Sequence, residues 1–314
     1  MNTKRILGVA LATIVVVSTA CAPRHKDAQP DVSDEAFSFR MTDDGGREVV
    51  LSKRPQTIVS LAPSLSEMVI TLGMTERLRG VTQWCDRPEA DAVERIGNMS
   101  EPDMERIITM RPDLVLGTEM TPRHIYDTLE AAGIPCIMFK HQGFDDVMAD
   151  MKTLADALGE RELGRRVVEG MEARRREILS RVPVGAAPVK VALLYDLDSM
   201  GSAGRGSWVD DMLGSLGLDN IANRAESSWP RLSREALLTE QPRYIILPLP
   251  LEPDKQGEFR ARAESLKNDP VWGRVEAVRN GGMILMPANL LNIPGPRTLD
   301  AMSFIADRVY GTER

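Results

Sequence analysis

The chain has 314 residues, of which 43% are hydrophobic and 27% are charged. This length and composition fit one large or two ordinary globular domains and exclude a small disulfide scaffold or a multi-span membrane protein. The 46 acidic residues outnumber 39 Lys and Arg, and the net charge of −7 argues against a nucleic-acid-binding body.

The first 20 residues have the pattern of a secretory signal peptide. Lys4 and Arg5 precede an apolar run over 6–17 that is too short to span a bilayer comfortably. Small residues at 18–20 precede Cys21, which predicts a lipoprotein signal with Cys21 as the lipid-modified first residue. The alternative is ordinary cleavage after Ala20. Residues 21–36 are polar and lack aromatic side chains, as expected of a tether between a lipid anchor and a folded body.

The pattern of an α/β protein begins at residue 37. Two alternating runs around Asp44 and Gly45 predict a β-hairpin. Apolar runs then predict strands at 57–62, 78–84, 114–117 and 134–139, and helical spacing predicts helices at 66–72, 104–110 and 123–132. This alternation implies a parallel sheet with helices on both faces, and thus an N-terminal lobe over 37–142.

A second α/β series follows a long helical pattern. Apolar residues recur at helical spacing through 143–182, which predicts one rigid interlobe helix with a potential break near Gly159. A C-terminal lobe is expected over 183–314. Residues 105–116 and 235–246 repeat the same helix, proline and strand pattern, and each proline predicts an extended residue before it. The predicted fold is therefore α/β, with two Rossmann-like lobes that have parallel sheets and are joined by one long backbone helix.

Few residues of the body offer redox or catalytic chemistry. Cys85 and Cys136 allow either one disulfide or two buried thiols. The sequence contains no phosphate-binding loop, nucleophile-elbow motif or zinc-protease motif. Besides His25 in the tether, His124 and His141 are too few for a histidine-rich metal site. We therefore expect neither an enzyme nor an intrinsic cofactor or resident metal.

Four motifs occur in a fixed order along the body. They are Ile58–Glu67 followed by Leu72-Gly73, Met104–Ile108 with Arg111–Val115, Trp229–Glu235, and Pro294–Arg297. Together they resemble the periplasmic binding proteins of ABC importers for iron chelates, haem and vitamin B12. The resemblance covers nearly the whole chain from residue 37.

The resemblance implies a monomeric carrier with a ligand cleft between two lobes. Its ligand would be a metal complex (a ferric siderophore, haem or cobalamin), and its partner an ABC permease dimer with its ATPase subunits. The protein would lie in the periplasm, lipid-anchored, or on the outer face of the cytoplasmic membrane where no outer membrane exists. In this family one surface glutamate of each lobe docks to the permease, and the matching positions here are Glu67 and Glu235. Both acids also fit helix-start roles, since Ser64 and Glu67 form a capping-box pattern and Glu235 follows Ser233.

A cleft for a large, flat ligand needs stacking surfaces and a few polar groups. Trp84, Trp208 and Trp229 stand at the ends of predicted elements, although each also fits core packing. The resemblance implies that the segment around Trp272 packs as structure instead.

Arg205, Asn289 and Arg297 are the polar ligand-binding candidates, because such groups bind propionate, phosphate or chelate carboxylates. Two other functions stay open: a receptor for free Mn or Zn on the same fold, and an exported enzyme with an unrecognised site.

Overall fold

The computed structural model describes residues 37–311. The first hairpin, β1 (Phe39–Thr42) and β2 (Glu48–Leu51), is antiparallel, as predicted around Asp44 and Gly45. The Asp43 carboxylate accepts hydrogen bonds from the backbone N–H groups of Gly45 at 3.0 Å and of Met138 at 3.0 Å. This carboxylate therefore closes the turn and fastens the hairpin to β7 (Cys136–Phe139).

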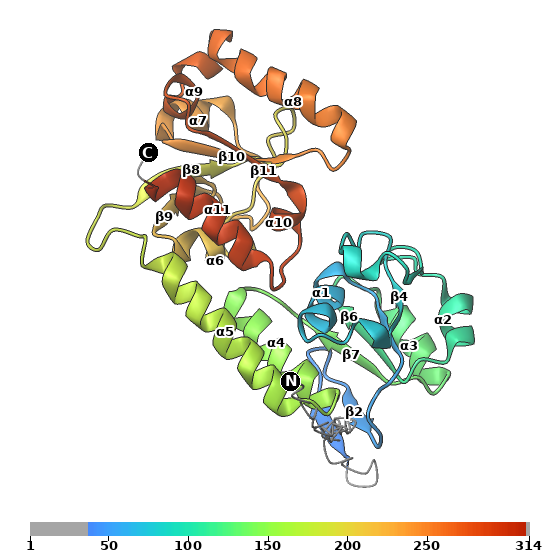
Figure 1. Cartoon of the computed structure of the whole chain (residues 1–314). Helices are drawn as coiled ribbons and strands as arrows, with labels where there is room; N and C mark the ends of the chain where they lie inside the picture. Colours follow the sequence, from blue (N-terminus) through green and yellow to red (C-terminus); the bar gives the residue numbers. More distant parts are fainter. Residues whose placement is uncertain (1–36, 312–314) are drawn as a thin grey trace, which may run out of the picture. The chain divides into compact units, whose positions relative to one another are not determined.

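Within residues 37–311, the strands of the N-terminal lobe form a five-stranded parallel sheet of order β5-β4-β3-β6-β7 (Figure 1). The other strands are β3 (Ile58–Ser60), β4 (Leu78–Val81), β5 (Glu94–Arg95) and β6 (Leu114–Thr118), and the helices are α1 (Pro63–Thr71), α2 (Met104–Met110) and α3 (Arg123–Ala131). Side chains of α2 and α3 pack on one face of the sheet, whereas α1 packs on the other. Helices on both faces explain why these strands are apolar throughout rather than alternating.

The interlobe segment is the main departure from the predicted elements. In place of one helix through 143–182 there are two, α4 (Phe144–Ala157) and α5 (Arg161–Leu179), which pack against each other (Figure 1). The break falls at Gly159, whose φ of +76° is left-handed and favours glycine. The backbone N–H of Glu160 then bonds to the carbonyl of Ala155 at 2.7 Å, so the helix ends in a tight turn.

The C-terminal lobe repeats the arrangement of the first. Within residues 37–311 its strands form a four-stranded parallel sheet of order β11-β10-β8-β9. The strands are β8 (Val189–Leu193), β9 (Leu218–Asn220), β10 (Tyr244–Leu249) and β11 (Met283–Pro287), and the helices are α6 (Trp208–Ser215), α7 (Arg234–Glu240), α8 (Pro253–Ser265), α9 (Glu276–Arg279), α10 (Ala288–Asn292) and α11 (Thr298–Tyr310). Side chains of α6 and α11 pack on one face, and those of α7 and α9 pack on the other.

The internal repeat extends to the backbone, although the prediction at the prolines was wrong. Arg111 ends α2 and Gln241 ends α7, and both have a φ of 47°. Each is thus left-handed rather than extended, because it also serves as the reversing residue at a helix C-terminus. The following Pro112 and Pro242 then start the approach to β6 and β10.

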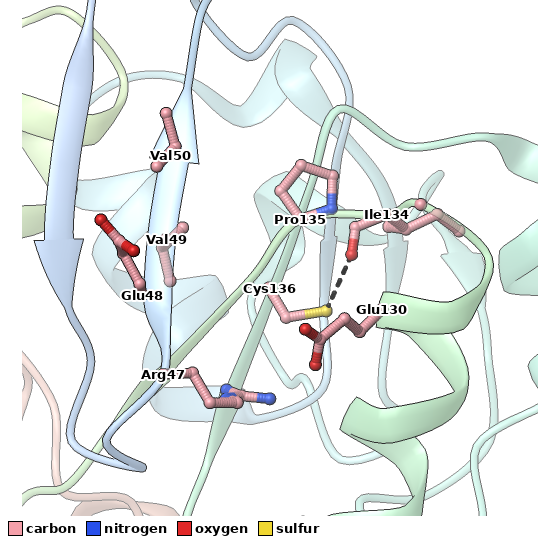
Figure 2. Close-up of a pocket in the computed structure, with 9 residues that line it drawn as sticks. Arg47, Glu48, Val49, Val50, Glu130, Ile134, Pro135 and Cys136 are labelled. Atoms are coloured by element: carbon pink, nitrogen blue, oxygen red, sulfur yellow. Dashed lines mark hydrogen bonds between the residues drawn. The ribbon is translucent and has the colours of Figure 1, made fainter.

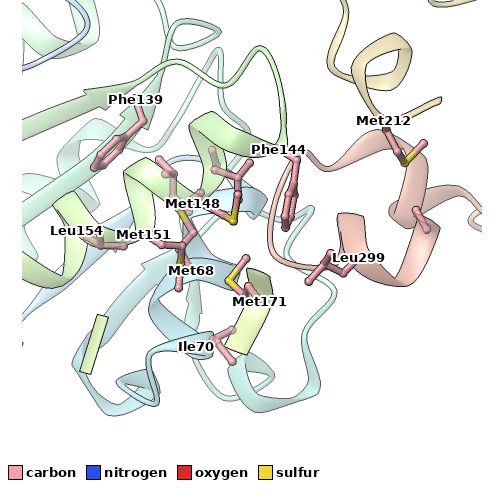
Figure 3. Packing of buried hydrophobic residues seen from close by; sticks show 14 of the residues in the cluster. Met68, Ile70, Phe139, Phe144, Met148, Met151, Leu154, Met171, Met212 and Leu299 are labelled. Atoms are coloured by element: carbon pink, nitrogen blue, oxygen red, sulfur yellow. The ribbon is translucent and has the colours of Figure 1, made fainter. Parts of the chain in front are cut away.

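One apolar cluster runs through both lobes. Figure 3 shows Phe144 and Met148 of α4 packed near Met68 of α1, Met171 of α5 and Leu299 of α11. The same cluster includes core residues of both sheets. Since buried apolar surface resists exposure to water, this cluster ties the lobes to the interlobe helices.

The two cysteines of the body do not form a disulfide. Among the described residues, Cys85 and Cys136 are free and buried, which excludes the disulfide alternative. Burial raises the pKa of the Cys136 thiol to about 12, so this thiol stays protonated and unreactive at neutral pH.

Candidate ligand-binding site

Exposed apolar side chains gather at the carboxyl ends of both sheets. Trp84 follows β4 and Met120 follows β6, while Leu251 follows β10. With Trp229, these side chains are between 51% and 66% exposed. Loops at the carboxyl ends of parallel strands are where α/β proteins bind ligands, and exposed large apolar side chains need an occupant. The candidate site therefore draws on both lobes.

A pairing between two loops positions Trp229. The backbone N–H of Ser202 donates to the carbonyl of Pro230 at 2.8 Å, and Gly201 bridges Arg231. This pairing brings the Trp229 ring to within 6.3 Å of the Tyr195 ring, at an interplanar angle of 36°. Burial raises the pKa of Tyr195 to about 12, so the phenol stays neutral. The two rings form one stacking surface. The sequence analysis proposed Trp229 for the site but not Tyr195.

The polar candidates Arg297 and Asn289 meet two acids of the N-terminal lobe. Arg297 Nε donates to Glu67 Oε1 at 2.7 Å, and Nη2 contacts the same oxygen. Arg297 also donates to Asp86, from Nη2 to Oδ1 at 2.5 Å and from Nη1 to Oδ2 at 3.1 Å. The Asn289 amide donates to Asp86 as well. Asp86 was not predicted as a site residue, although it stands two residues after Trp84.

Burial and hydrogen bonding shift the pKa values of Glu67, Asp86 and Arg297 in different directions. Glu67 is fully buried, and this burial raises the pKa of its carboxyl despite the opposing hydrogen bonds from Arg297. Burial alone would raise the pKa of Asp86 too, but hydrogen bonds from Arg297 and Asn289 outweigh it and lower that pKa. For Arg297, the two carboxylates likewise outweigh burial and raise the pKa of the guanidinium. Arg297 is therefore charged and saturated with partners.

Glu67 corrects two expectations. It is not a surface residue in this structure, and it does not form a capping box with Ser64. Helix α1 begins with Pro63, and its N-cap residue Ala62 offers no side-chain acceptor. Glu67 lies one turn further on, where it faces Arg297 across the lobes.

Glu235 has the helix-start position expected for it. It is exposed in the first turn of α7, and Ser233 is the N-cap, with its Oγ accepting from the backbone N–H of Ala236 at 3.0 Å. Hydrogen bonds from its own backbone and from Ser233 lower the pKa of Glu235, so it carries its charge at neutral pH.

The remaining candidates lie near one another on the α6 side of the C-terminal lobe. Arg205 is exposed in the turn before α6, and Trp208 is the first residue of that helix. Trp208 is half-buried against the main apolar cluster, so part of its ring serves core packing. Trp272, predicted to be structural, is buried in the second cluster of this lobe.

The buried side chain of His141 lies beside Ser64 at the start of α1. His141 Nδ1 is 2.7 Å from Asp150 Oδ2, and its Nε2 is 3.5 Å from Ser64 Oγ. Burial raises the pKa of the Asp150 carboxyl. Ser64 is itself only 3% exposed, and a Cβ atom at Gly295 would lie 3.5 Å from its Cα, so the Ser64 hydroxyl is covered by the loop before α11. We interpret these residues as packing that fixes the connection between β7 and α4.

One hollow lies away from the carboxyl ends of the sheets. A cavity of about 230 Å³ has walls from β2, the end of α3 and the start of β7 (Figure 2). Cys136 faces it and donates to the carbonyl of Ile134 at 3.4 Å, and Glu130 and Arg47 lie beside it. The Cys136 thiol is protonated, and no aromatic ring is among the residues that line this hollow. The hollow therefore lacks the stacking surfaces of the candidate site at the carboxyl ends of the sheets.

Residues 37–311 contain no group of three or more His, Cys, Asp or Glu side chains placed to hold a metal ion. No helix in this part of the chain is both long and apolar enough to cross a membrane.

Comparison with known proteins defines the class. The model of the periplasmic binding protein family matches residues 58–290, which is most of the chain. The chain belongs to this family, in agreement with its two parallel-sheet lobes.

Individual relatives and a solved structure are similar to this chain. It is 22% identical to YvrC, an uncharacterized ABC transporter substrate-binding lipoprotein of Bacillus subtilis, over 96% of this chain and 94% of that protein. It is 28% identical to the vitamin B12-binding protein of Pectobacterium atrosepticum, over 62% of this chain and 71% of that protein. Among solved structures, the periplasmic heme-binding protein RhuT of Roseiflexus in its apo form superposes with a TM-score of 0.70 at 26% identity, over 81% of this chain and 98% of that one.

Proposed function

We propose that this chain is the substrate-binding lipoprotein of an ABC importer, and that it captures a metal complex between its two lobes. The observation that carries the proposal is the set of exposed Trp84, Met120, Trp229 and Leu251 at the carboxyl ends of both sheets. Such side chains can cover both sides of a large, flat ligand.

The relatives narrow the ligand class. Vitamin B12-binding and heme-binding proteins are among the chains most similar to this one. Both ligands are metal macrocycles, which bury broad apolar faces and carry polar groups at their edges. We propose cobalamin, haem or a ferric siderophore as the ligand, with the aromatic pair Tyr195 and Trp229 as one wall. Trp84, Trp208 and Arg205 are other proposed contacts. Asn289 and Arg297 are proposed as well, but they bond to Asp86 and Glu67 in this structure and would reach a ligand only after those bonds open.

The lipoprotein part of the proposal rests on the sequence. Cys21 and the signal at 1–20 lie outside the described residues, as does the tether at 21–36. A lipid on Cys21 would hold a monomeric carrier at a membrane beside its permease. The proposed docking groups are Glu235, which is exposed, and Glu67, which Arg297 covers in this structure.

A calorimetric titration tests the proposal. The chain from Pro23 onward keeps every described residue, and it would be titrated with cyanocobalamin, haemin and a set of ferric siderophores. We expect saturable binding of one ligand at micromolar concentration or tighter. Trp229→Ala should weaken it about tenfold, because it removes a stacking face worth on the order of 1–2 kcal/mol.

The matched control is Ile108→Ala, which removes an exposed apolar side chain from α2. This variant should bind as the unaltered chain does. No binding across the panel, together with a stoichiometric divalent metal in the purified protein, would contradict the proposal and favour the metal-ion receptor.

A further inference from the structure

Arg297 links the two lobes through charged hydrogen bonds. Its partners Glu67 and Asp86 precede it in sequence by 230 and 211 positions. The Arg297 side chain is 17% exposed and that of Glu67 is 1% exposed, whereas Asp86 is about one-third exposed. The electrostatic attraction within a pair so shielded from water is stronger than within a surface pair. Removing one partner therefore costs more free energy of folding.

The backbone on both sides is fitted closely around this contact. A Cβ atom at Gly295 would lie 3.0 Å from Glu67 Oε2 and 3.5 Å from Ser64 Cα. The loop before α11 therefore lies directly against the start of α1, with little room for a side chain between them. Glu67 Oε2 has no hydrogen-bond partner within the described part of the chain, so the carboxylate depends on Arg297 alone.

Two neighbouring arginines are paired with other acids and so do not replace Arg297 as the partner of Glu67 and Asp86. Arg87, whose charge also acts on Glu67, donates to Glu89 at 2.7 and 3.2 Å and is thereby occupied. Arg174 on α5 is paired with Asp300 at 2.6 Å. Two carboxylates of one lobe thus share a single guanidinium from the other.

We propose that Arg297, Glu67 and Asp86 form an ion-pair latch between the lobes, and that this latch covers the carboxylate of Glu67 until the lobes move apart. Two contacts support this coupling: the guanidinium of Arg297 bonds to Glu67, and the Gly295 backbone lies against its other oxygen. Only the consequence for docking rests on the proposed function. If Glu67 binds the permease, the latch must open before that contact forms.

Carboxyl labelling with a water-soluble carbodiimide and an amine tests the latch without ligand or permease. Mass spectrometry would give the labelling rate of Glu67 relative to Glu235, which is exposed and serves as an internal reference. We expect Glu67 to react at least tenfold more slowly than Glu235 in the unaltered protein. Arg297→Met should remove most of this difference, and Asp86→Asn should remove part of it.

Arg174→Met is the matched control, because it also breaks an arginine–aspartate pair beside α11 but touches neither acid of the latch. It should leave the ratio unchanged, and an unchanged far-UV circular dichroism spectrum and urea midpoint well above zero denaturant report that each variant is folded. Equal rates for Glu67 and Glu235 in the unaltered protein would overturn the proposal, as would an Arg297→Met variant that still protects Glu67.

The order of opening and docking needs a separate measurement. With the permease in lipid nanodiscs, Asp86→Asn should dock faster than the unaltered protein because its latch has lost one anchor. An equal or slower rate would overturn the proposed order while leaving the latch itself intact.

Discussion

Replacing Arg297 with methionine tests whether the buried charge cluster stabilises the fold. The substitution keeps most of the aliphatic volume but leaves Glu67, which is 1% exposed, without the one ion-pair partner it has among the described residues. Removing one partner of a fully buried pair costs roughly 3–5 kcal/mol. Because Arg297 is itself 17% exposed and Asp86 can turn to water, we expect the low end, about 3 kcal/mol at pH 7, or more than 100-fold in the unfolding equilibrium.

The loss should depend on pH in a definite direction. Burial raises the pKa of Glu67, so the native protein holds this proton more tightly than the unfolded chain does. That contribution to stability is present at low pH and is lost as the pH rises through the raised pKa. Without Arg297 the pKa rises further, since the like charge of Asp86 remains and Arg87 acts only from a distance. The difference between the two proteins should therefore be largest at neutral pH and smaller at about pH 5.

Urea unfolding of the chain from Pro23 onward measures both effects. Glu67→Gln combined with Arg297→Met should be more stable at pH 7 than Arg297→Met alone, because no charge is then left buried. The control Arg174→Met should cost less than about 1 kcal/mol at either pH, as expected for an exposed pair. A loss below about 1 kcal/mol for Arg297→Met, or one equal at both pH values, would refute the reasoning.

Three further predictions follow from local structure. Gly159→Ala should destabilise the fold by about 1 kcal/mol or more in urea unfolding, because φ is +76° and the new Cβ would lie 2.8 Å from Arg54 Nε. If the variant loses no stability, the break between α4 and α5 does not lie at Gly159. Ser233→Ala should cost about 1 kcal/mol in the same assay through loss of the α7 cap, and a neutral result would show that the cap bond is not formed in solution. Cys85 and Cys136 should react with a thiol reagent only in denaturant, and fast reaction of the native protein would contradict their burial.

Much of the fold could be predicted because its determinants are local. Apolar runs, helical spacing and the hairpin around Gly45 lie within short windows of sequence, and they gave two α/β lobes. The break at Gly159 was foreseen only as an option, because a glycine is compatible with a helix as well as with its end. The left-handed Arg111 and Gln241 were missed, since proline favours an extended predecessor but does not require one.

The candidate site was less accessible to sequence reasoning because its contacts are long-range. Trp229 and Arg297 could be proposed from residue type and motif. That Arg297 reaches Glu67, 230 positions away, follows from the packing of two lobes and leaves no local signal. The same holds for Asp86, whose role is visible only once Arg297 and Asn289 lie beside it.

Hydrogen exchange with and without the ligand selected by titration tests the central claim most directly. Binding between the lobes predicts slower exchange in segments of both: residues 82–87 and 118–122 of the N-terminal lobe, and residues 226–231 and 250–252 of the C-terminal lobe. Protection confined to one lobe, or centred on the hollow beside Cys136, would contradict it.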